Sequence, residues 1–272
     1  MYVWFLYHRK MKLNFYQIDA FTEHIFSGNP ACVVPLEEWL PDAMLLKITQ
    51  ENAVAETAFF VPEGDKFHLR WFTPEIEMDL CGHATLATAH VITTILGYSK
   101  PTIVFTTLSG DIEVTVAEGW YTLDFPSRMP EAAVLPELIA QALSIQPSQV
   151  LKSRDYVLVY DNEADIRAIQ INRNLLDQVN LDPGGIVVTA KGAHSDFVSR
   201  FFTPQASILE DPVTGSAHCS LIPYWAAALG KKEMTAFQLS ERGGQLFCVD
   251  AGERVRISGH AKTYASGTCW TE

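Results

Sequence analysis

Runs of aromatic and branched residues, several of them alternating with polar positions, predict a strand-rich chain. The strand pattern begins at Met11 and continues over 12–21. We expect residues 1–10, which precede this pattern, to lie outside the fold. The other predicted strands are 32–35, 57–61, 66–72, 102–107, 112–116, 120–125, 156–159, 186–189 and 255–257.

Two further segments, 82–96 and 215–229, are apolar or small on nearly every side, and each is followed by a glycine that suits a helix C-terminus. A helix that is apolar all round has to be covered all round. We therefore expect each of these helices to be wrapped by a curved sheet. Amphipathic helices are predicted at 41–51 and 165–179.

The chain contains an internal repeat. Arg70-Trp-Phe-Thr-Pro returns as Arg200-Phe-Phe-Thr-Pro, and Cys81-Gly-His-Ala returns as Thr214-Gly-Ser-Ala. Leu96-Gly then returns as Leu229-Gly, in the same order along the chain and at the same displacement as the second motif. Self-similarity of this kind predicts two similar halves. We place them at 11–120, to which the C-terminal strand is free to return, and at 121–272.

Charge and cysteine content exclude several classes of protein. The net charge is −12, which disfavours nucleic acid and anionic membrane surfaces as partners. No apolar run reaches the ~18 residues that a membrane helix needs. The five cysteines are odd in number and form no Cys-x-x-Cys, which indicates a reducing compartment, the cytoplasm.

The repeat also predicts where a ligand binds. The two central helices begin at Gly82-His83 and Gly215-Ser216. A helix N-terminus has unpaired N–H groups and a partial positive charge, so it attracts carboxylates and other anions. If the halves are related by a pseudo-twofold axis, both starts face one cleft and bind one anion there. In the alternative interpretation, His83 makes a local bond in the first turn and Ser216 is a capping residue.

Two acidic residues are candidates for chemistry. Glu56 lies in an apolar stretch that enters a strand, where burial favours the neutral acid and suits general acid/base work. The second half has glycines at roughly the corresponding place, so the carboxylate is present in one half only. Asp211 precedes the second helix and could cap the loop, orient His83, or hold an amino or hydroxyl group of a ligand. For both residues a structural role is the alternative.

The order of the motifs resembles the PhzF-like family. These motifs are Asp19-Ala-Phe-Thr, Gly28-Asn-Pro-Ala, Ala55-Glu-Thr-Ala-Phe, Phe72-Thr-Pro, Cys81-Gly-His-Ala-Thr and Glu210-Asp-Pro-Val-Thr-Gly-Ser-Ala. The resemblance covers residues 11 to about 265. It implies an α+β fold like that of diaminopimelate epimerase, with two pseudo-symmetric halves, each a β-barrel around a central α-helix. It also implies a homodimer.

The resemblance assigns roles to particular residues. Glu56 matches the acid/base that moves a proton between carbons. His83, Asp211 and Ser216 match residues that line the substrate pocket, and the N–H groups of Gly82 and Gly215 match those near a carboxylate. No metal and no organic cofactor is implied. The function expected from the resemblance is a cofactor-independent isomerase of a small carboxylic acid.

Two alternatives remain open. The related epimerases use one cysteine at each helix start, but here Cys81 is matched by Thr214, and Cys219 lies too far along the second helix. We interpret Cys81 as a small buried apolar residue, with a racemase or epimerase that uses Glu56 and Cys81 as the alternative. A non-catalytic binding protein is the other. Asn29 is a possible ligand contact, although Gly-Asn-Pro is an ordinary turn signal.

Overall fold

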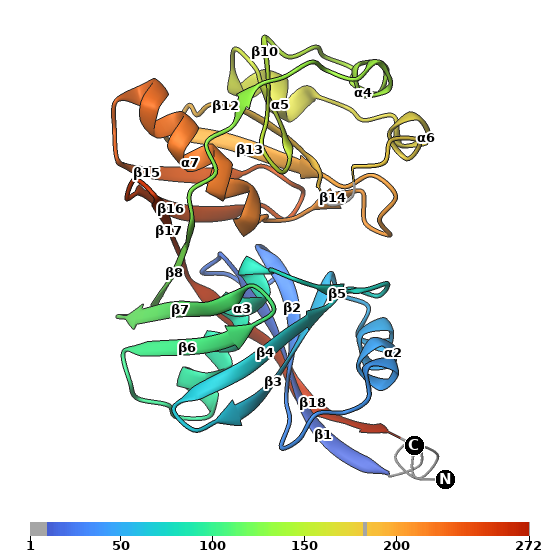
Figure 1. Ribbon diagram of the computed structural model, residues 1–272, viewed down its shortest axis with the longest axis vertical. Coiled ribbons are helices and arrows are strands. Elements are labelled where there is room, and N and C mark those ends of the chain that lie inside the picture. Colours follow the sequence, from blue (N-terminus) through green and yellow to red (C-terminus); the bar gives the residue numbers. More distant parts are fainter. Residues whose placement is uncertain (1–9, 182–183, 272) are drawn as a thin grey trace. The chain divides into compact units, whose positions relative to one another are not determined.

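The computed structural model describes residues 10–181 and 184–271, so the N-terminal segment 1–9 lies outside the described residues (Figure 1). The chain divides into two compact units. The first contains the chain up to Leu123 together with the residues from Gly259 onward, and the second is Asp124–Ser258. The chain leaves the first unit within β8 (Trp120–Pro126) and returns at the end of β17 (Arg254–Gly259).

The first unit is a mixed sheet around one buried helix. Its remaining strands are β1 (Met11–Ala20), β2 (Asn29–Pro35), β3 (Glu56–Glu63), β4 (Lys66–Phe72), β5 (Glu77–Met78), β6 (Thr102–Thr107), β7 (Gly110–Ala117) and β18 (Ala261–Thr271). β1 lies between β18 and β2 and is antiparallel to both, whereas β2 and β3 are parallel. The sheet continues through β4, β6 and β7 to β8. Helix α2 (Asp42–Asn52) packs on β3 and β4, as the amphipathic pattern predicts.

The buried helix is α3 (Gly82–His90), which contacts β1, β2, β3 and β18. All of its residues from Gly82 to Ala89 are buried. We predicted an α-helix as far as Leu96, but the last turn is a π-helix over Val91–Ile95. The hydroxyls of Thr93 and Thr94 donate to carbonyls one turn back, which competes with the regular backbone bonds. The helix still ends at a left-handed glycine, Gly97, with φ of 75°.

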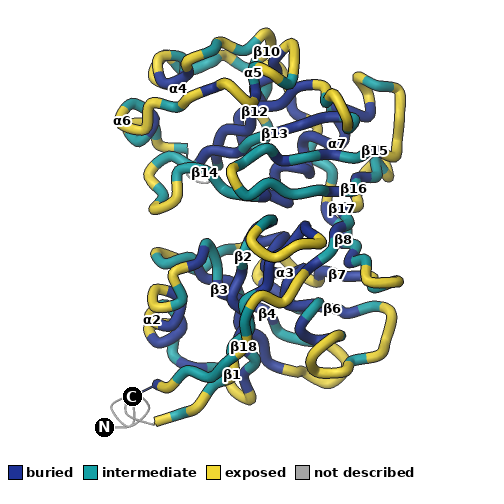
Figure 2. The backbone as a smooth tube through the Cα atoms, turned by 180° about the vertical axis from the view of Figure 1, so that it is seen from behind, coloured by how far each residue is buried: buried dark blue, intermediate teal, exposed yellow. Residues whose placement is uncertain are grey.

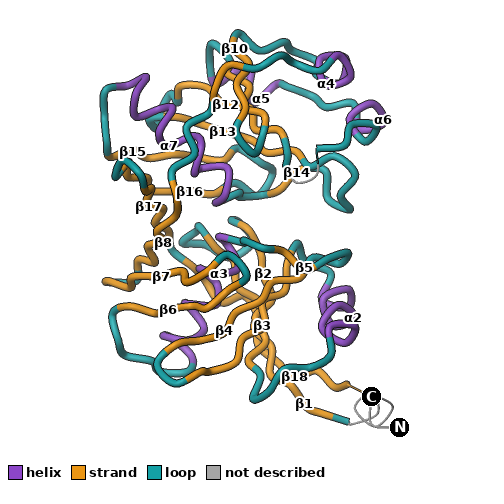
Figure 3. Tube along the Cα trace, viewed as in Figure 1, coloured by secondary structure: helices purple, strands orange, loops and turns teal. Residues whose placement is uncertain are grey.

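The second unit repeats this plan. Its remaining strands are β9 (Glu131–Ala132), β10 (Gln149–Lys152), β11 (Tyr156–Val159), β12 (Ile186–Lys191), β13 (Phe197–Phe202), β14 (Glu210–Asp211), β15 (Glu233–Gln238) and β16 (Gly244–Asp250). β11 and β12 are parallel, and β13 is antiparallel to β12 and parallel to β15. Figure 3 colours the strands orange and the helices purple. The buried helix here is α7 (Gly215–Leu229), which ends at the left-handed Gly230 as expected. The short helices are α4 (Glu137–Ala142), α5 (Glu163–Ala168) and α6 (Arg173–Leu176).

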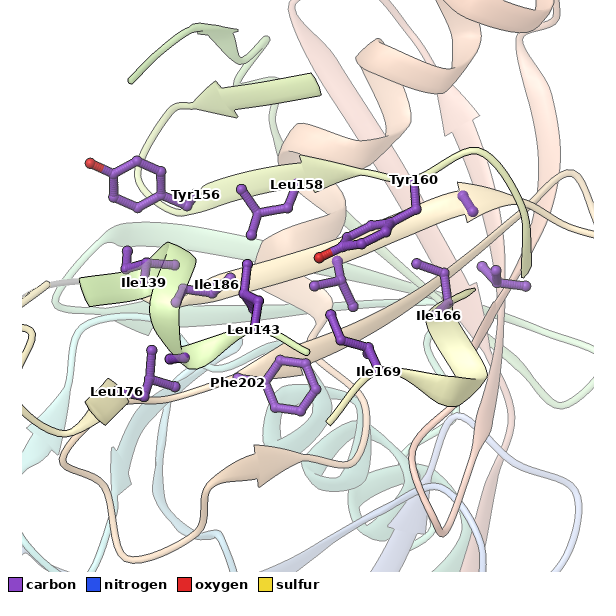
Figure 4. Close-up of a cluster of buried hydrophobic side chains, with 14 residues drawn as sticks. Ile139, Leu143, Tyr156, Leu158, Tyr160, Ile166, Ile169, Leu176, Ile186 and Phe202 are labelled. Atoms are coloured by element: carbon purple, nitrogen blue, oxygen red, sulfur yellow. The ribbon is translucent and has the colours of Figure 1, made fainter. Parts of the chain in front are cut away.

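The single helix predicted at 165–179 is wrong, because the segment forms α5 and α6 with a break between them. Asn172 lies in this break and its side chain accepts a hydrogen bond from the Leu175 N–H, so it starts a new helix. The Arg200 guanidinium binds the carbonyls of Ile166 and Ile169 at the end of α5. Apolar residues of both helices still pack into one buried cluster with Phe202 (Figure 4).

The predicted strands are confirmed, and their ends differ from the prediction by a few residues at most. Phe21, predicted as the last residue of the first strand, lies outside β1 and has a left-handed φ of 62°. Burial follows the predicted pattern, with α3 and α7 buried along most of their length (Figure 2). In the described part of the chain, no helix is both long and apolar enough to cross a membrane. All five cysteines are described, and none of them forms a disulfide.

Candidate active site

Glu56 and His83 meet in the first unit. Glu56 is the first residue of β3 and His83 is the second residue of α3. Glu56 Oε2 lies 3.1 Å from His83 Nε2, and the two side chains are 16% and 4% exposed. The pair lacks hydrogen-bond geometry, and within the described chain neither atom has another hydrogen-bond partner. Buried polar atoms without an aligned hydrogen bond are uncommon, and a catalytic role or a bound water or ion is among the explanations for them.

The other nitrogen of the His83 ring has two neighbours. The amide nitrogen of Asn29 lies 3.2 Å from Nδ1, and Cys81 Sγ lies 3.6 Å from it. Asn29 is completely buried at the start of β2, so it is more than a turn residue. When the amide donates to Nδ1, a neutral His83 carries its proton on Nε2, toward Glu56.

Burial and neighbouring groups shift the pKa values of His83 and Cys81. Burial by itself lowers the pKa of His83, but the neighbouring Cys81 and Glu56 groups outweigh it and raise that pKa well above its usual value. Burial raises the pKa of the Cys81 thiol, which His83 only partly opposes. The pKa values of Cys81 and His83 thus depend on each other, because the two side chains are buried side by side.

The start of α7 in the second unit is tied to Asp211 and Gln238. The hydroxyl of Thr214 donates to the carboxylate of Asp211. The side chain of Gln238 accepts from the Thr214 N–H at 2.9 Å and donates to the Asp211 carbonyl at 2.7 Å. Asp211 thus fastens the loop before α7, which is the structural role considered for it. Gln238 is almost completely buried and was not singled out by the sequence.

Ser216, in the first turn of α7, lies beside a cation that the sequence analysis missed. Arg154, between β10 and β11, donates from Nη2 to Ser216 Oγ at 3.2 Å. Its Nε lies 3.3 Å from Asp155 Oδ1, and this buried carboxylate also accepts the Gly185 N–H at 2.9 Å. No motif marks Arg154, because it lies in the short turn between β10 and β11 and meets Ser216 only through tertiary packing.

Both central helices start without a capping side chain. Cys81 and Thr214 precede Gly82 and Gly215 in extended conformations, and neither side chain bonds to the first turn. The first N–H groups of each helix therefore keep their capacity to bind an anion. The structure thus groups Glu56, His83, Cys81 and Asn29 in the first unit. In the second unit it groups Asp211 with Thr214 and Ser216 with Arg154.

Three donor groups in the first unit are close enough to share a metal ion. One ligand atom each of Glu56, Cys81 and His83 lie within 4.8 Å of one another. Imidazole, thiolate and carboxylate together form a donor set that suits zinc.

Comparison with known proteins places this site in context. The sequence model of a family described as PhzC-PhzF, phenazine biosynthesis-like protein, matches residues 18–267. An uncharacterised isomerase of Pseudomonas aeruginosa is 46% identical over 258 residues, which cover 95% of this chain and 99% of the relative. A crystal structure of a PhzF-family protein from Enterococcus faecalis is 45% identical with a TM-score of 0.90, covering 95% of this chain and 99% of that one.

A more distant structure extends the likeness in fold. A predicted epimerase from Pseudomonas aeruginosa matches with a TM-score of 0.70 at 18% identity, over 94% of this chain and 99% of that chain. The fold expected from the resemblance, an α+β epimerase-like fold, is therefore confirmed.

Proposed function

Because this chain belongs to the PhzC-PhzF family of phenazine biosynthesis-like proteins, we propose that it is an isomerase of a small carboxylic acid. The observation that carries this proposal is the pairing of Glu56 with His83, two buried groups whose facing atoms have no hydrogen-bond partner within the described chain. In this proposal no metal and no organic cofactor takes part in the reaction.

Glu56 is the proposed acid/base. Its carboxylate takes a proton from a carbon next to an electron-withdrawing group of the substrate, and the electrons of the broken C–H bond move into that conjugated group. The same carboxyl then returns the proton to a different carbon, so that a double bond has moved and no atom is gained or lost. A proton on His83 Nε2, 3.1 Å from Glu56 Oε2, stabilises the carboxylate before it takes the proton and after it returns the proton.

The remaining candidate residues are proposed to bind the substrate. The N–H groups at Gly82, Gly215 and Ser216 provide donors for carboxylate oxygens. Arg154 adds a positive charge beside Ser216. Asp211 is proposed to hold an amino or hydroxyl group of the substrate, since a carboxylate that accepts from Thr214 can accept further hydrogen bonds.

Exchange of carbon-bound hydrogen with deuterated solvent tests the proposal. A panel of small unsaturated and amino carboxylic acids is incubated with the protein in D₂O and followed by proton NMR. We expect at least one acid to exchange, and Glu56→Gln to lower that rate by ~10²–10⁴, the usual contribution of a general acid/base. Glu63→Gln, which alters an exposed acid on the same strand, is the control and should leave the rate unchanged. Equal rates for wild type and Glu56→Gln would overturn the assignment.

An epimerase that uses Glu56 with Cys81 is the second candidate. The observation that favours it is the thiol 3.6 Å from His83 Nδ1, which puts Cys81 and Glu56 at opposite nitrogens of one ring. A reaction that needs Cys81 is abolished in Cys81→Ala, whereas the isomerase reaction survives this change. If no carboxylic acid exchanges hydrogen with solvent, the third candidate, a non-catalytic binding protein, takes precedence.

We also propose that the protein works in the cytoplasm as a homodimer. The free state of all five cysteines supports a reducing compartment. Light scattering coupled to gel filtration tests the assembly, and we expect twice the chain mass of 30.3 kDa. A mass of one chain at micromolar concentration would contradict it.

A further inference from the structure

We propose that Glu56, Cys81 and His83 form a binding site for Zn²⁺, and that the bound ion blocks the acid/base. The ion is an inhibitor in this proposal and takes no part in the reaction. Metal binding rests on the geometry of these three residues alone, whereas inhibition also rests on the proposed function.

The distances among the donor atoms suit one ion. Zinc binds nitrogen and oxygen at about 2.0–2.1 Å and thiolate at about 2.3 Å, so two ligands of a tetrahedral ion lie roughly 3.3–3.7 Å apart. His83 Nε2 and Glu56 Oε2 are already separated by 3.1 Å. One ligand atom from each of the three residues lies within 4.8 Å of the other two. Cys81 Sγ is 3.6 Å from Nδ1, the ring nitrogen that does not face Glu56, so the thiol or the ring has to turn before one ion can bind all three.

Two of these atoms are buried beside each other without an aligned hydrogen bond. His83 Nε2 and Glu56 Oε2 are buried, and neither forms a hydrogen bond to any described residue. The His83 side chain is only 4% exposed, so bulk water gives it little compensation. Once His83 Nε2 has given up its proton, this atom and Glu56 Oε2 are two close electron-pair donors, which is how neighbouring ligands of a common ion are arranged.

The surroundings suit a cation in charge and in orientation. The carboxylate of Glu56 and the thiolate of Cys81 together balance the two positive charges of the ion, so no net charge is buried. Binding releases two protons to solvent, one from the thiol and one from the charged His83 ring. The amide of Asn29, 3.2 Å from Nδ1, holds the ring from its far side. With its oxygen turned to Nδ1 it accepts the ring proton there, which leaves Nε2 free to bind the ion.

An ion at this place stops proton transfer for a simple reason. The Glu56 oxygen that would take the substrate proton is occupied by the metal bond. The fourth position of the ion remains open, as in zinc sites that keep an exchangeable ligand, and water or a substrate carboxylate can fill it.

Cobalt absorption provides a test that is independent of activity. Co²⁺ is titrated into the full-length protein, and the near-ultraviolet band of a cobalt–thiolate bond is recorded. We expect about one ion per chain with this band, and displacement of cobalt by Zn²⁺. Cys81→Ala should lose the band. Cys81→Ala and Glu56→Gln should each weaken binding by at least ~10-fold, since even changes to residues that only support a metal ligand have effects of this size.

A matched control separates the site from cysteine content in general. Cys219 is also buried, but it lies on α7, and Cys219→Ala should keep both the band and the affinity. A band that persists in Cys81→Ala, a band lost in Cys219→Ala, or no ion bound by wild type would each overturn the proposal. Circular dichroism verifies that both alanine variants are folded. If cobalt binds as expected while deuterium exchange is never observed, the proposed function fails and the metal site stands.

Discussion

Glu56 and Gly185 occupy corresponding positions in the two units. Each directly precedes a strand residue that pairs with a phenylalanine of the repeat: Thr57 pairs with Phe72, and Ile186 pairs with Phe202. A Cβ atom at Gly185 would lie 2.3 Å from Phe201 Cζ and 2.9 Å from the Phe202 carbonyl oxygen. The space for a side chain is therefore filled in the second unit, and only the first unit holds a carboxylate there.

This relationship predicts that Gly185→Ala destabilises the protein. The added methyl group has to displace the Phe201 ring and the backbone beside it, and overpacking of this kind costs about 1–3 kcal/mol. Urea denaturation measures the loss. In the double variant with Phe201→Leu, which shortens the blocking side chain, the cost of the alanine should be smaller. An alanine variant as stable as wild type would contradict this close approach.

The internal repeat also includes two matching ion pairs, one in each unit. Arg70 binds both carboxylate oxygens of Glu77 at 2.7 and 2.6 Å. Arg200 binds both oxygens of Glu210 at 2.7 and 2.8 Å, in the matching part of the second unit. In both pairs the arginine is 16% and the glutamate 23% exposed.

These pairs predict unequal effects of the same substitution. Glu77→Gln leaves Arg70 with the carboxylate of Asp42 at 2.9 Å, whereas Glu210→Gln leaves Arg200 with backbone carbonyls of the α5 segment. We expect a loss of about 1 kcal/mol for the first and about 2–3 kcal/mol for the second, since a half-buried charge then lacks its counter-ion. Denaturation curves of the two variants, measured in parallel, decide this. Equal losses, or a larger loss for Glu77→Gln, would show that Asp42 contributes nothing.

Much of this architecture follows from short-range sequence patterns. The repeat placed both buried helices, because a helix that is apolar all round and ends in glycine has few alternatives. The π-helical turn at Val91 depends on threonine hydroxyls competing for backbone carbonyls, and the break at Asn172 on a capping side chain inside an otherwise helical pattern. Hydrophobic periodicity carries no information on either.

The candidate site was only partly predictable for a similar reason. Glu56 and His83 stand in recognisable motifs, and the structure places them in contact. Asn29 was undervalued because its turn signal says nothing of the distant histidine ring that it meets. Arg154 and Gln238 belong to no motif, and their contacts with the start of α7 arise from tertiary packing.

The burial of His218 leads us to expect that the protein loses stability in mild acid. Its ring is completely buried, and burial lowers its pKa from 6.5 to about 4, although Nδ1 faces the Thr214 carbonyl at 2.9 Å. The unfolded chain takes up a proton below pH 6.5 and the folded chain does not. Stability therefore falls as the pH drops from about 6.5 to about 4. One pKa unit corresponds to about 1.4 kcal/mol, so this group contributes up to about 3 kcal/mol to the change.

The substitution His218→Asn isolates this contribution. The asparagine amide keeps a donor for the Thr214 carbonyl but does not titrate. Its free energy of unfolding should be flatter than that of wild type over the same pH range. His194→Asn, which alters an exposed histidine, is the control and should follow the wild-type curve. Identical pH dependence in wild type and His218→Asn would contradict the assignment.

The position of Arg154 leads us to expect that its substitution weakens substrate binding and leaves the chemical step unchanged. Its guanidinium donates to Ser216 Oγ at 3.2 Å and stays 24% exposed, so it can also bind an anion at the start of α7. If it binds the substrate carboxylate equally in the ground and transition states, Arg154→Gln raises KM and leaves kcat nearly unchanged. The loss of a hydrogen bond to a charged group costs about 1.5–3 kcal/mol, or ~10–100-fold in KM.

The assay is hydrogen exchange with the carboxylic acid that the panel identifies, at several substrate concentrations. Arg154→Lys keeps the charge and should recover part of the affinity, whereas Arg167→Gln, which alters an exposed arginine paired with Glu163, should change neither constant. A fall in kcat at constant KM would instead place Arg154 in the chemical step.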